Sequence, residues 1–114
     1  MGYVGIDLDG TLAHYDGWVS EEHIGEPIAS TVRLVQHLLA NRKDVRIFTA
    51  RVARKSGKDL ECTERFIDMW CIRHLGRTLP ITCVKDYEME IYYDDRCVQM
   101  ITNTGRRADG ESLT

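Results

Sequence analysis

The sequence predicts an α/β fold in which helices cover both faces of a mostly parallel, five-stranded sheet. Short apolar runs alternate with segments of helical periodicity, a pattern typical of repeated strand–helix–strand units. Polar residues that can perform chemistry follow several of these runs, and such folds bind ligands at the carboxyl ends of their strands. A length of 114 residues is enough for one hydrophobic core.

The first half of the chain contains two expected strands joined by a helix. Residues 2–8 are an apolar run typical of a buried strand. Pro27 suits the first turn of a helix, and apolar residues recur from there at helical spacing to about Ala40. Asn41 is a suitable left-handed stop, and the second strand follows over residues 45–48.

The second half begins with a longer helix, expected over residues 59–75, with Asp59 as its N-cap and Gly76 at its end. Its inner face consists of apolar side chains at helical spacing, namely Ile67, Trp70, Cys71 and Leu75. Three short strands are expected at 81–84, 91–93 and 98–101. The prediction is therefore one domain over residues 1–103 and a polar, flexible tail over 104–114.

Composition and charge narrow the classes of function. With 43% hydrophobic and 29% charged residues, the chain has the composition of a soluble globular domain. Its formal net charge of −3 argues against nucleic acid as the main partner, because backbone-binding proteins usually carry a basic excess. No apolar stretch approaches the roughly 20 residues that cross a bilayer, and the N-terminus lacks a signal-peptide pattern. We expect a cytoplasmic protein with no membrane partner.

The first apolar run leads directly into the motif Asp7-Leu8-Asp9-Gly10-Thr11. Alternate residues of a strand point to the same side, so the two carboxylates leave the strand together, and Gly10 permits an unusual turn. An aspartate is ionised at neutral pH and needs no base to become a nucleophile. A phosphate monoester is an anionic target whose charge Mg²⁺ neutralises. The motif therefore predicts a magnesium-dependent nucleophile at Asp7.

Other strand ends supply the remaining parts of such a site. Mg²⁺ prefers octahedral oxygen ligation, and the candidate ligands are the carboxylates after the first and fourth strands: Asp7, Asp9, Asp94 and Asp95. Asp9 is the candidate general acid, which protonates the leaving alkoxide and then, as a base, deprotonates water. Thr49 can donate a hydrogen bond to the phosphate, and Lys85 can neutralise its charge. Backbone amides in the Gly10-Thr11 turn complete the anion pocket.

In this order, the motifs resemble those of the haloacid dehalogenase superfamily of phosphohydrolases, over about residues 2–102. The family's nucleophile, acid/base, hydroxyl, lysine and acidic positions fall on Asp7, Asp9, Thr49, Lys85 and the pair Asp94-Asp95. More narrowly, the chain resembles short hydrolase-like proteins of phages and prophages, some of them named for their likeness to polynucleotide kinase phosphatase domains. The resemblance implies a Rossmann-like three-layer core, Mg²⁺ as cofactor, and phosphatase activity through an aspartyl-phosphate.

The spacing leaves no room for the large cap domain that many members of this family carry. Residues 12–48 already contain a predicted helix and strand, and residues 86–93 are too few for a full crossover helix. We therefore expect a pocket that is open to solvent. Capless relatives tend to act on phosphates of large molecules or to borrow a lid from a partner subunit, so a homodimer is one expected arrangement.

The expected rim of the pocket offers two kinds of substrate contact. The loop over 12–26 carries four candidate side chains: His14, Tyr15, Trp18 and His23. Its aromatic rings either stack on a nucleobase or sugar or pack the loop against the sheet. A basic cluster beside Thr49 consists of Arg51, Arg54, Lys55 and Lys58. This cluster either binds a second phosphate or a nucleic-acid end, or it is a solvated loop.

Three classes of function fit these residues. The leading one is a Mg²⁺-dependent phosphomonoesterase whose substrate is a phosphorylated small molecule, such as a nucleotide, or a nucleic-acid 3′-phosphate. A receiver-type phospho-acceptor also combines Asp, Thr, Lys and Mg²⁺, but receivers place their acidic pair early, whereas Asp94-Asp95 comes last here. The third is a binding or scaffold protein that keeps the site with little turnover. Metal-dependent binding without turnover would identify it.

Overall fold

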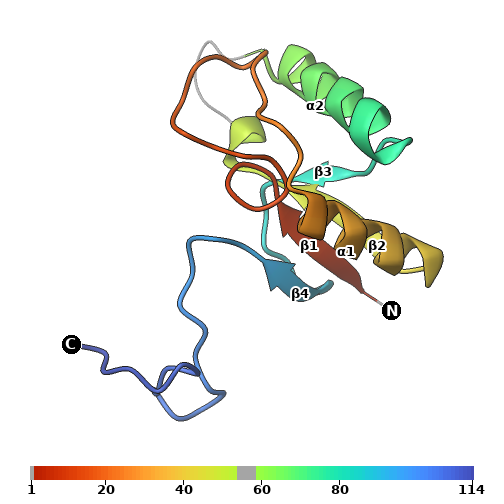
Figure 1. Cartoon of the computed structure of the whole chain (residues 1–114). Helices are drawn as coiled ribbons and strands as arrows, with labels where there is room; N and C mark the ends of the chain where they lie inside the picture. The colour runs from red at the N-terminus through yellow and green to blue at the C-terminus, as the bar shows by residue number, and fades with distance from the viewer. Residues whose placement is uncertain (1, 54–58) are drawn as a thin grey trace.

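The computed structural model describes residues 2–53 and 59–114, and Figure 1 shows the arrangement of its elements. In chain order the elements are β1 (Tyr3–Asp7), α1 (Ala29–Ala40), β2 (Asp44–Phe48), the 3₁₀ turn η1 (Ala50–Val52), α2 (Leu60–Leu75), β3 (Ile81–Thr82) and β4 (Met89–Tyr93). The four strands form one sheet in the order β3-β2-β1-β4. The predicted α/β class with a parallel sheet is confirmed.

Strand β1 lies at the centre of the sheet and positions the site. It pairs in parallel with β2 on one side and with β4 on the other. Asp7 stands opposite Phe48, and Ile6 stands opposite Tyr93. Because all three strands run in the same direction, the residues that follow Asp7, Phe48 and Tyr93 emerge at one edge of the sheet.

The hydrophobic core lies between the sheet and the two helices. Alternate residues of β1 and β2 share one buried cluster with side chains from both helices: Val4, Ile6, Val45, Ile47, Val35, Ile67, Trp70 and Cys71. The helices also contact each other. Both helices therefore cover the same face of the sheet, and the predicted inner face of the second helix is confirmed.

The opposite face of the sheet is covered by side chains and a connecting loop. Tyr3 is 1% exposed, its hydroxyl donates to the Val84 carbonyl at 3.3 Å, and the Arg46 guanidinium lies 4.0 Å from the centre of its ring. The rings of Phe48 and Tyr92 pack with centroids 4.6 Å apart. No helix lies on this face within the described ranges, so two layers replace the three expected, because the short β3–β4 connection holds no crossover helix.

The predicted fifth strand at 98–101 is wrong. The chain leaves the sheet after β4 (Figure 1), and Val98 and Met100 are 52% and 42% exposed. The Asp94 carboxylate accepts from the Arg96 amide at 3.2 Å and turns the backbone at this point. Further along, the Ala108 amide donates to the Gln99 carbonyl at 2.8 Å. The segment 98–101 therefore forms backbone hydrogen bonds with the C-terminal tail instead of with the sheet.

The helix ends follow the expectations in part. The Asp59 carboxylate accepts from the Cys62 amide at 3.1 Å, and Gly76 has a left-handed φ of 80°, so both predicted ends of α2 are confirmed. Helix α1 begins at Ala29, because Pro27 pairs with Ala13 in an isolated antiparallel bridge instead of opening the helix.

The left-handed residue after α1 is Arg42, with φ 59°, whereas Asn41 has φ −92°. The prediction for Asn41 is therefore wrong. Its side-chain amide instead donates to the His37 carbonyl at 2.8 Å and satisfies the end of the helix in this way. Among the described helices, none combines the length and apolar character needed to cross a bilayer.

Candidate active site

Three carboxylates meet at the sheet edge where β1 and β4 end. Asp7 is the last residue of β1, while Asp94 and Asp95 directly follow β4. One carboxylate oxygen from each residue lies within 4.8 Å of the other two. Gly10, with φ 94°, comes so close to Asp95 that a side chain at position 10 would collide with that carboxylate. Glycine at this position therefore permits both the positive φ of the turn and the close approach of the Asp95 carboxylate.

The cluster changes the protonation of its central residue. Burial raises the pKa of Asp7 to about 7, and a hydrogen bond with Asp95 and the negative charge of Asp94 act in the same direction. The Thr11 hydroxyl donates to Asp7 Oδ2 at 3.2 Å and partly opposes this rise. Without a cation, the three carboxylates together therefore bind a proton near neutral pH. A cation bound between them would displace this proton.

The spacing of these oxygens suits a small divalent cation. Mg²⁺ binds oxygen at about 2.1 Å, so ligands on opposite sides of its octahedron are about 4.2 Å apart. At most one pair among three ligands can be opposite, and adjacent ligands are about 3.0 Å apart, so the three carboxylates must draw closer than 4.8 Å to share one ion. Asp7, Asp94 and Asp95 are thus residues that can hold the ion, with water filling its remaining positions.

Asp9 lies outside this cluster and is held by an arginine. Arg51 Nε donates to Asp9 Oδ2 at 2.7 Å, and a terminal nitrogen of Arg51 donates to Asp9 Oδ1 at 3.0 Å. The Arg51 side chain is 5% exposed and that of Asp9 19%. The structure therefore places the Asp9 carboxylate in an ion pair rather than with the three candidate metal ligands.

Arg51 also holds the loop that leaves the active-site turn. Its remaining N–H groups donate to backbone carbonyls of Ser20 at 3.4 Å, Glu21 at 3.1 Å and His23 at 2.9 Å. The Trp18 ring lies over the same guanidinium, 5.0 Å from its carbon to the ring centroid. Arg51 was expected to bind substrate, but its donors contact groups of the protein itself. The other members of the basic cluster, Arg54, Lys55 and Lys58, lie outside the described residues.

Thr49 and Lys85 take different places. Thr49 follows β2 and is 2% exposed, and its hydroxyl oxygen accepts from the Arg51 amide at 3.1 Å. No acceptor for the Thr49 hydroxyl proton is found among the residues that the structure describes. Lys85 is exposed in the loop between β3 and β4. No hydrogen bond or ion pair joins it to Asp7 within the described part of the chain.

The loop between the active-site turn and α1 is closed at its base and tied at its tip. The His14 amide donates to the Glu26 carbonyl at 2.8 Å, and Gly25 packs against the carbonyl of His14. The His14 ring is exposed and hydrogen-bonds to Asp16 at 2.9 Å, so it faces solvent. Trp18 is 56% exposed and is the loop aromatic that the structure places beside the Asp9–Arg51 pair.

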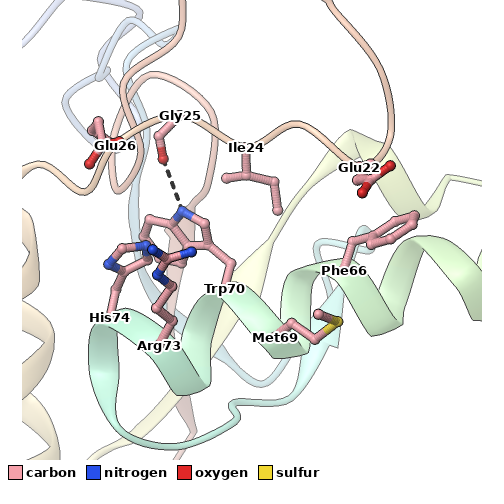
Figure 2. A pocket seen from close by; sticks show the side chains of 9 residues that line it. All are labelled: Glu22, Ile24, Gly25, Glu26, Phe66, Met69, Trp70, Arg73 and His74. Carbon is pink, nitrogen blue, oxygen red and sulfur yellow. Dashed lines mark hydrogen bonds between the residues drawn. The ribbon is translucent and has the colours of Figure 1, made fainter.

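A pocket of about 330 Å³ lies between this loop and α2 (Figure 2). It is lined by Glu22, Ile24, Gly25, Glu26, Phe66, Met69, Trp70, Arg73 and His74. The Trp70 indole N–H donates to the Gly25 carbonyl at 2.9 Å, and the Trp70 ring packs against His74 with centroids 4.7 Å apart. Trp70 thus holds the loop at Gly25, separately from the contacts of Arg51 with Ser20, Glu21 and His23.

Sequence reasoning missed the ion pair between Asp9 and Arg51. Both residues lie shortly beyond the ends of neighbouring parallel strands, because Asp7 stands opposite Phe48. Alignment of the two expected strands in parallel, with Asp7 opposite Phe48, is the signal that could have predicted this ion pair. The basic residues after Arg51 instead suggested a solvated or substrate-facing cluster.

Comparison with known proteins supports the fold. No family model and no curated protein matches the chain. A solved structure of a conserved protein from Bacteroides thetaiotaomicron is similar, with a TM-score of 0.56 and 20% sequence identity. The match covers 85% of this chain and 78% of that one. At this identity the likeness establishes that the two chains share a fold.

Proposed function

We propose that this protein is a Mg²⁺-dependent phosphomonoesterase of the haloacid dehalogenase type, with Asp7 as its nucleophile. The observation that carries the proposal is the meeting of Asp7, Asp94 and Asp95 at one sheet edge, with oxygens within 4.8 Å of one another. A half-buried carboxylate beside two others is unfavourable without a cation. The Asp-x-Asp-Gly-Thr order of the turn adds support from the sequence.

In the first half-reaction, the residues of the site have different roles. Asp7, Asp94 and Asp95 hold Mg²⁺, which when bound offsets the negative charge of the phosphate and of the carboxylates. An Asp7 oxygen forms a bond to phosphorus while the bond from phosphorus to the leaving oxygen breaks, and protonated Asp9 gives that oxygen its proton. Thr49 donates its hydroxyl hydrogen to a phosphate oxygen.

The second half-reaction restores the enzyme. Asp9, now a carboxylate, accepts a proton from the water molecule that attacks phosphorus. The bond between phosphorus and the Asp7 oxygen breaks, and inorganic phosphate leaves. Both steps require an Asp9 oxygen to reach the substrate, so at least one of its two contacts with Arg51 must give way.

The surroundings of Asp9 favour a leaving group with a planar ring. The exposed ring of Trp18 lies over the Arg51 guanidinium, and that guanidinium binds Asp9. Trp18 is therefore close to the residue that protonates the leaving group. Stacking on an aromatic side chain tolerates any base. A nucleotide or a nucleic-acid 3′-phosphate is the substrate class that fits this arrangement.

The test is phosphate release from a panel of phosphomonoesters, with and without Mg²⁺. The panel extends from p-nitrophenyl phosphate through nucleotides to oligonucleotides phosphorylated at either end. We expect Mg²⁺-dependent turnover that Asp7→Asn abolishes and that Asp16→Asn, an exposed loop variant, leaves unchanged. Turnover that persists in Asp7→Asn would contradict the nucleophile assignment.

A metal-dependent binding protein with little turnover is the second candidate. It is favoured by the ion pair that occupies both Asp9 oxygens and by the exposed position of Lys85. Its signature is saturable, Mg²⁺-dependent binding of a nucleotide that is recovered intact.

A further inference from the structure

Arg51 joins the loop over 15–25 to the acid/base residue of the proposed reaction. We propose that Arg51 is a positioning residue: it holds the Asp9 carboxylate and the loop segment Ser20–His23 as one unit and does not bind the substrate phosphate. This inference rests on the proposed function for its kinetic consequence. Its structural part, the coupling of the loop to Asp9, is independent of any activity.

The donors of Arg51 are already used within the protein, which argues against a direct role in phosphate binding. An arginine has five N–H donors in a planar fork. Two of them contact Asp9, and the remaining contacts are with the carbonyls of Ser20, Glu21 and His23. The side chain is only 5% exposed. A phosphate could contact this guanidinium only by displacing a partner that it already has.

The same contacts explain why the loop and Asp9 move together. When a buried guanidinium loses some of its hydrogen-bond partners, the folded state is destabilised because a buried charge is left unpaired. Withdrawal of Ser20–His23 would leave donors unpaired, and so would rotation of Asp9 away from Arg51. Each set of contacts therefore stabilises the other through the one side chain that they share.

The far end of the loop is fixed separately, which confines the coupling to this segment. Trp70 donates to the Gly25 carbonyl, and the His14 amide donates to the Glu26 carbonyl, so the base of the loop is held without Arg51. Trp18, which precedes this segment in the chain, contacts the same guanidinium through its ring.

The first test uses metal-free protein and needs no turnover. Hydrogen exchange of backbone amides by NMR compares wild type with Asp9→Asn and with the loop control Asp16→Asn. We expect Asp9→Asn to speed exchange of the 21–23 amides about fivefold or more, with α2 amides unchanged, and Asp16→Asn to have no such effect. Unchanged exchange at 21–23 in Asp9→Asn overturns the coupling.

The second test separates positioning from substrate binding by kinetics. Arg51→Lys keeps the charge but loses the two-point contact with Asp9. We expect kcat to fall about tenfold or more and KM to change less than about threefold, because the lost effect acts through a general acid. In the Asp9→Asn background, Arg51→Lys should cause no further fall in kcat. A raised KM with unchanged kcat, or additive losses, overturns the inference.

Arg107→Lys is the matched control, because Arg107 makes the same two-point contact with Asp109, at 3.0 and 2.6 Å, in the exposed tail. It should leave kcat and KM unchanged. If Arg51→Lys does not fold, the exchange experiment on Asp9→Asn decides alone. If the wild type turns over no phosphomonoester, the proposed function fails while the exchange experiment still judges the coupling.

Discussion

Gly10 and Asp95 approach so closely that a Cβ atom on Gly10 would lie 2.8 Å from the Asp95 carboxyl carbon. Gly10 also has a φ of 94°, which side chains rarely adopt. The glycine in the turn after β1 thereby leaves room for the Asp95 carboxylate, which follows β4.

Gly10→Ala is therefore expected to displace Asp95 and to weaken Mg²⁺ binding about tenfold, as misplacing a metal ligand commonly does. Isothermal titration calorimetry with Mg²⁺ measures the change. Gly17→Ala is the matched control, because Gly17 has φ 128° with no atom within 4 Å of the added carbon. Equal losses of affinity in both variants would show that backbone strain, not the approach of Asp95, is responsible.

Asp7→Asn is expected to stabilise the metal-free protein above neutral pH. Burial raises the pKa of Asp7 from 3.8 to about 7, so the folded state binds this proton more tightly than the unfolded state. The stability contributed by the proton is present at low pH and is lost as pH rises through about 7. Asparagine has no proton to lose.

Urea unfolding without metal, from about pH 5 to pH 8, measures the difference. After allowance for solvent screening, we expect Asp7→Asn to exceed wild type by about 1 kcal/mol at pH 8. Saturating Mg²⁺ should reduce or reverse the difference, because the wild type binds the ion more tightly. A wild type that is the more stable protein at pH 8 without metal would contradict the prediction.

Trp18→Ala should discriminate between substrates. If its ring stacks on the leaving group, KM for nucleotides rises about tenfold, in line with about 1–3 kcal/mol for one stacked base. KM for glycerol phosphate, which has no ring, should stay the same. Steady-state kinetics on both substrates make the comparison, with the neighbouring exposed Val19→Ala as control. Equal rises for both substrates would assign Trp18 to the loop structure alone.

The core between the sheet and α2 gives a prediction about stability. Ile67 is fully buried among the sheet residues, whereas Ile72 on the same helix is 56% exposed. Ile67→Ala is expected to cost about 2–4 kcal/mol of unfolding free energy, and Ile72→Ala about 0.5 kcal/mol or less. Chemical denaturation of both variants gives the values, and similar costs would argue against the described orientation of α2.

The parts of the site that could be predicted are those fixed by strand direction. Once parallel strands end at Asp7, Phe48 and Tyr93, the side chains that follow must emerge at one edge. For this reason the sequence correctly anticipates that Asp7 and the Asp94-Asp95 pair meet. The ends of α2 were also predictable, because Asp59 and Gly76 act through local backbone geometry.

What the sequence could not determine depends on contacts between distant segments. An apolar pattern at 98–101 resembles a strand, but a strand forms only where a partner accepts its hydrogen bonds, and this segment pairs with the tail instead. Lys85 has a suitable place in the order of motifs, yet its loop leaves it exposed. Arg51 was expected to bind substrate or to be solvated, whereas in the structure its guanidinium binds Asp9.

The pairing of β4 with β1 brings together residues from opposite ends of the chain. The entropy cost of closing the long loop between two such strands arises before their contacts can offset it. Asp7 gains its two acidic neighbours only when β4 docks, and their mutual repulsion opposes that docking. A cation held by all three would favour the docked strand by mass action. If the proposed Mg²⁺ is bound there, the ion would also hold β4 against β1, and its removal would let this strand open more often.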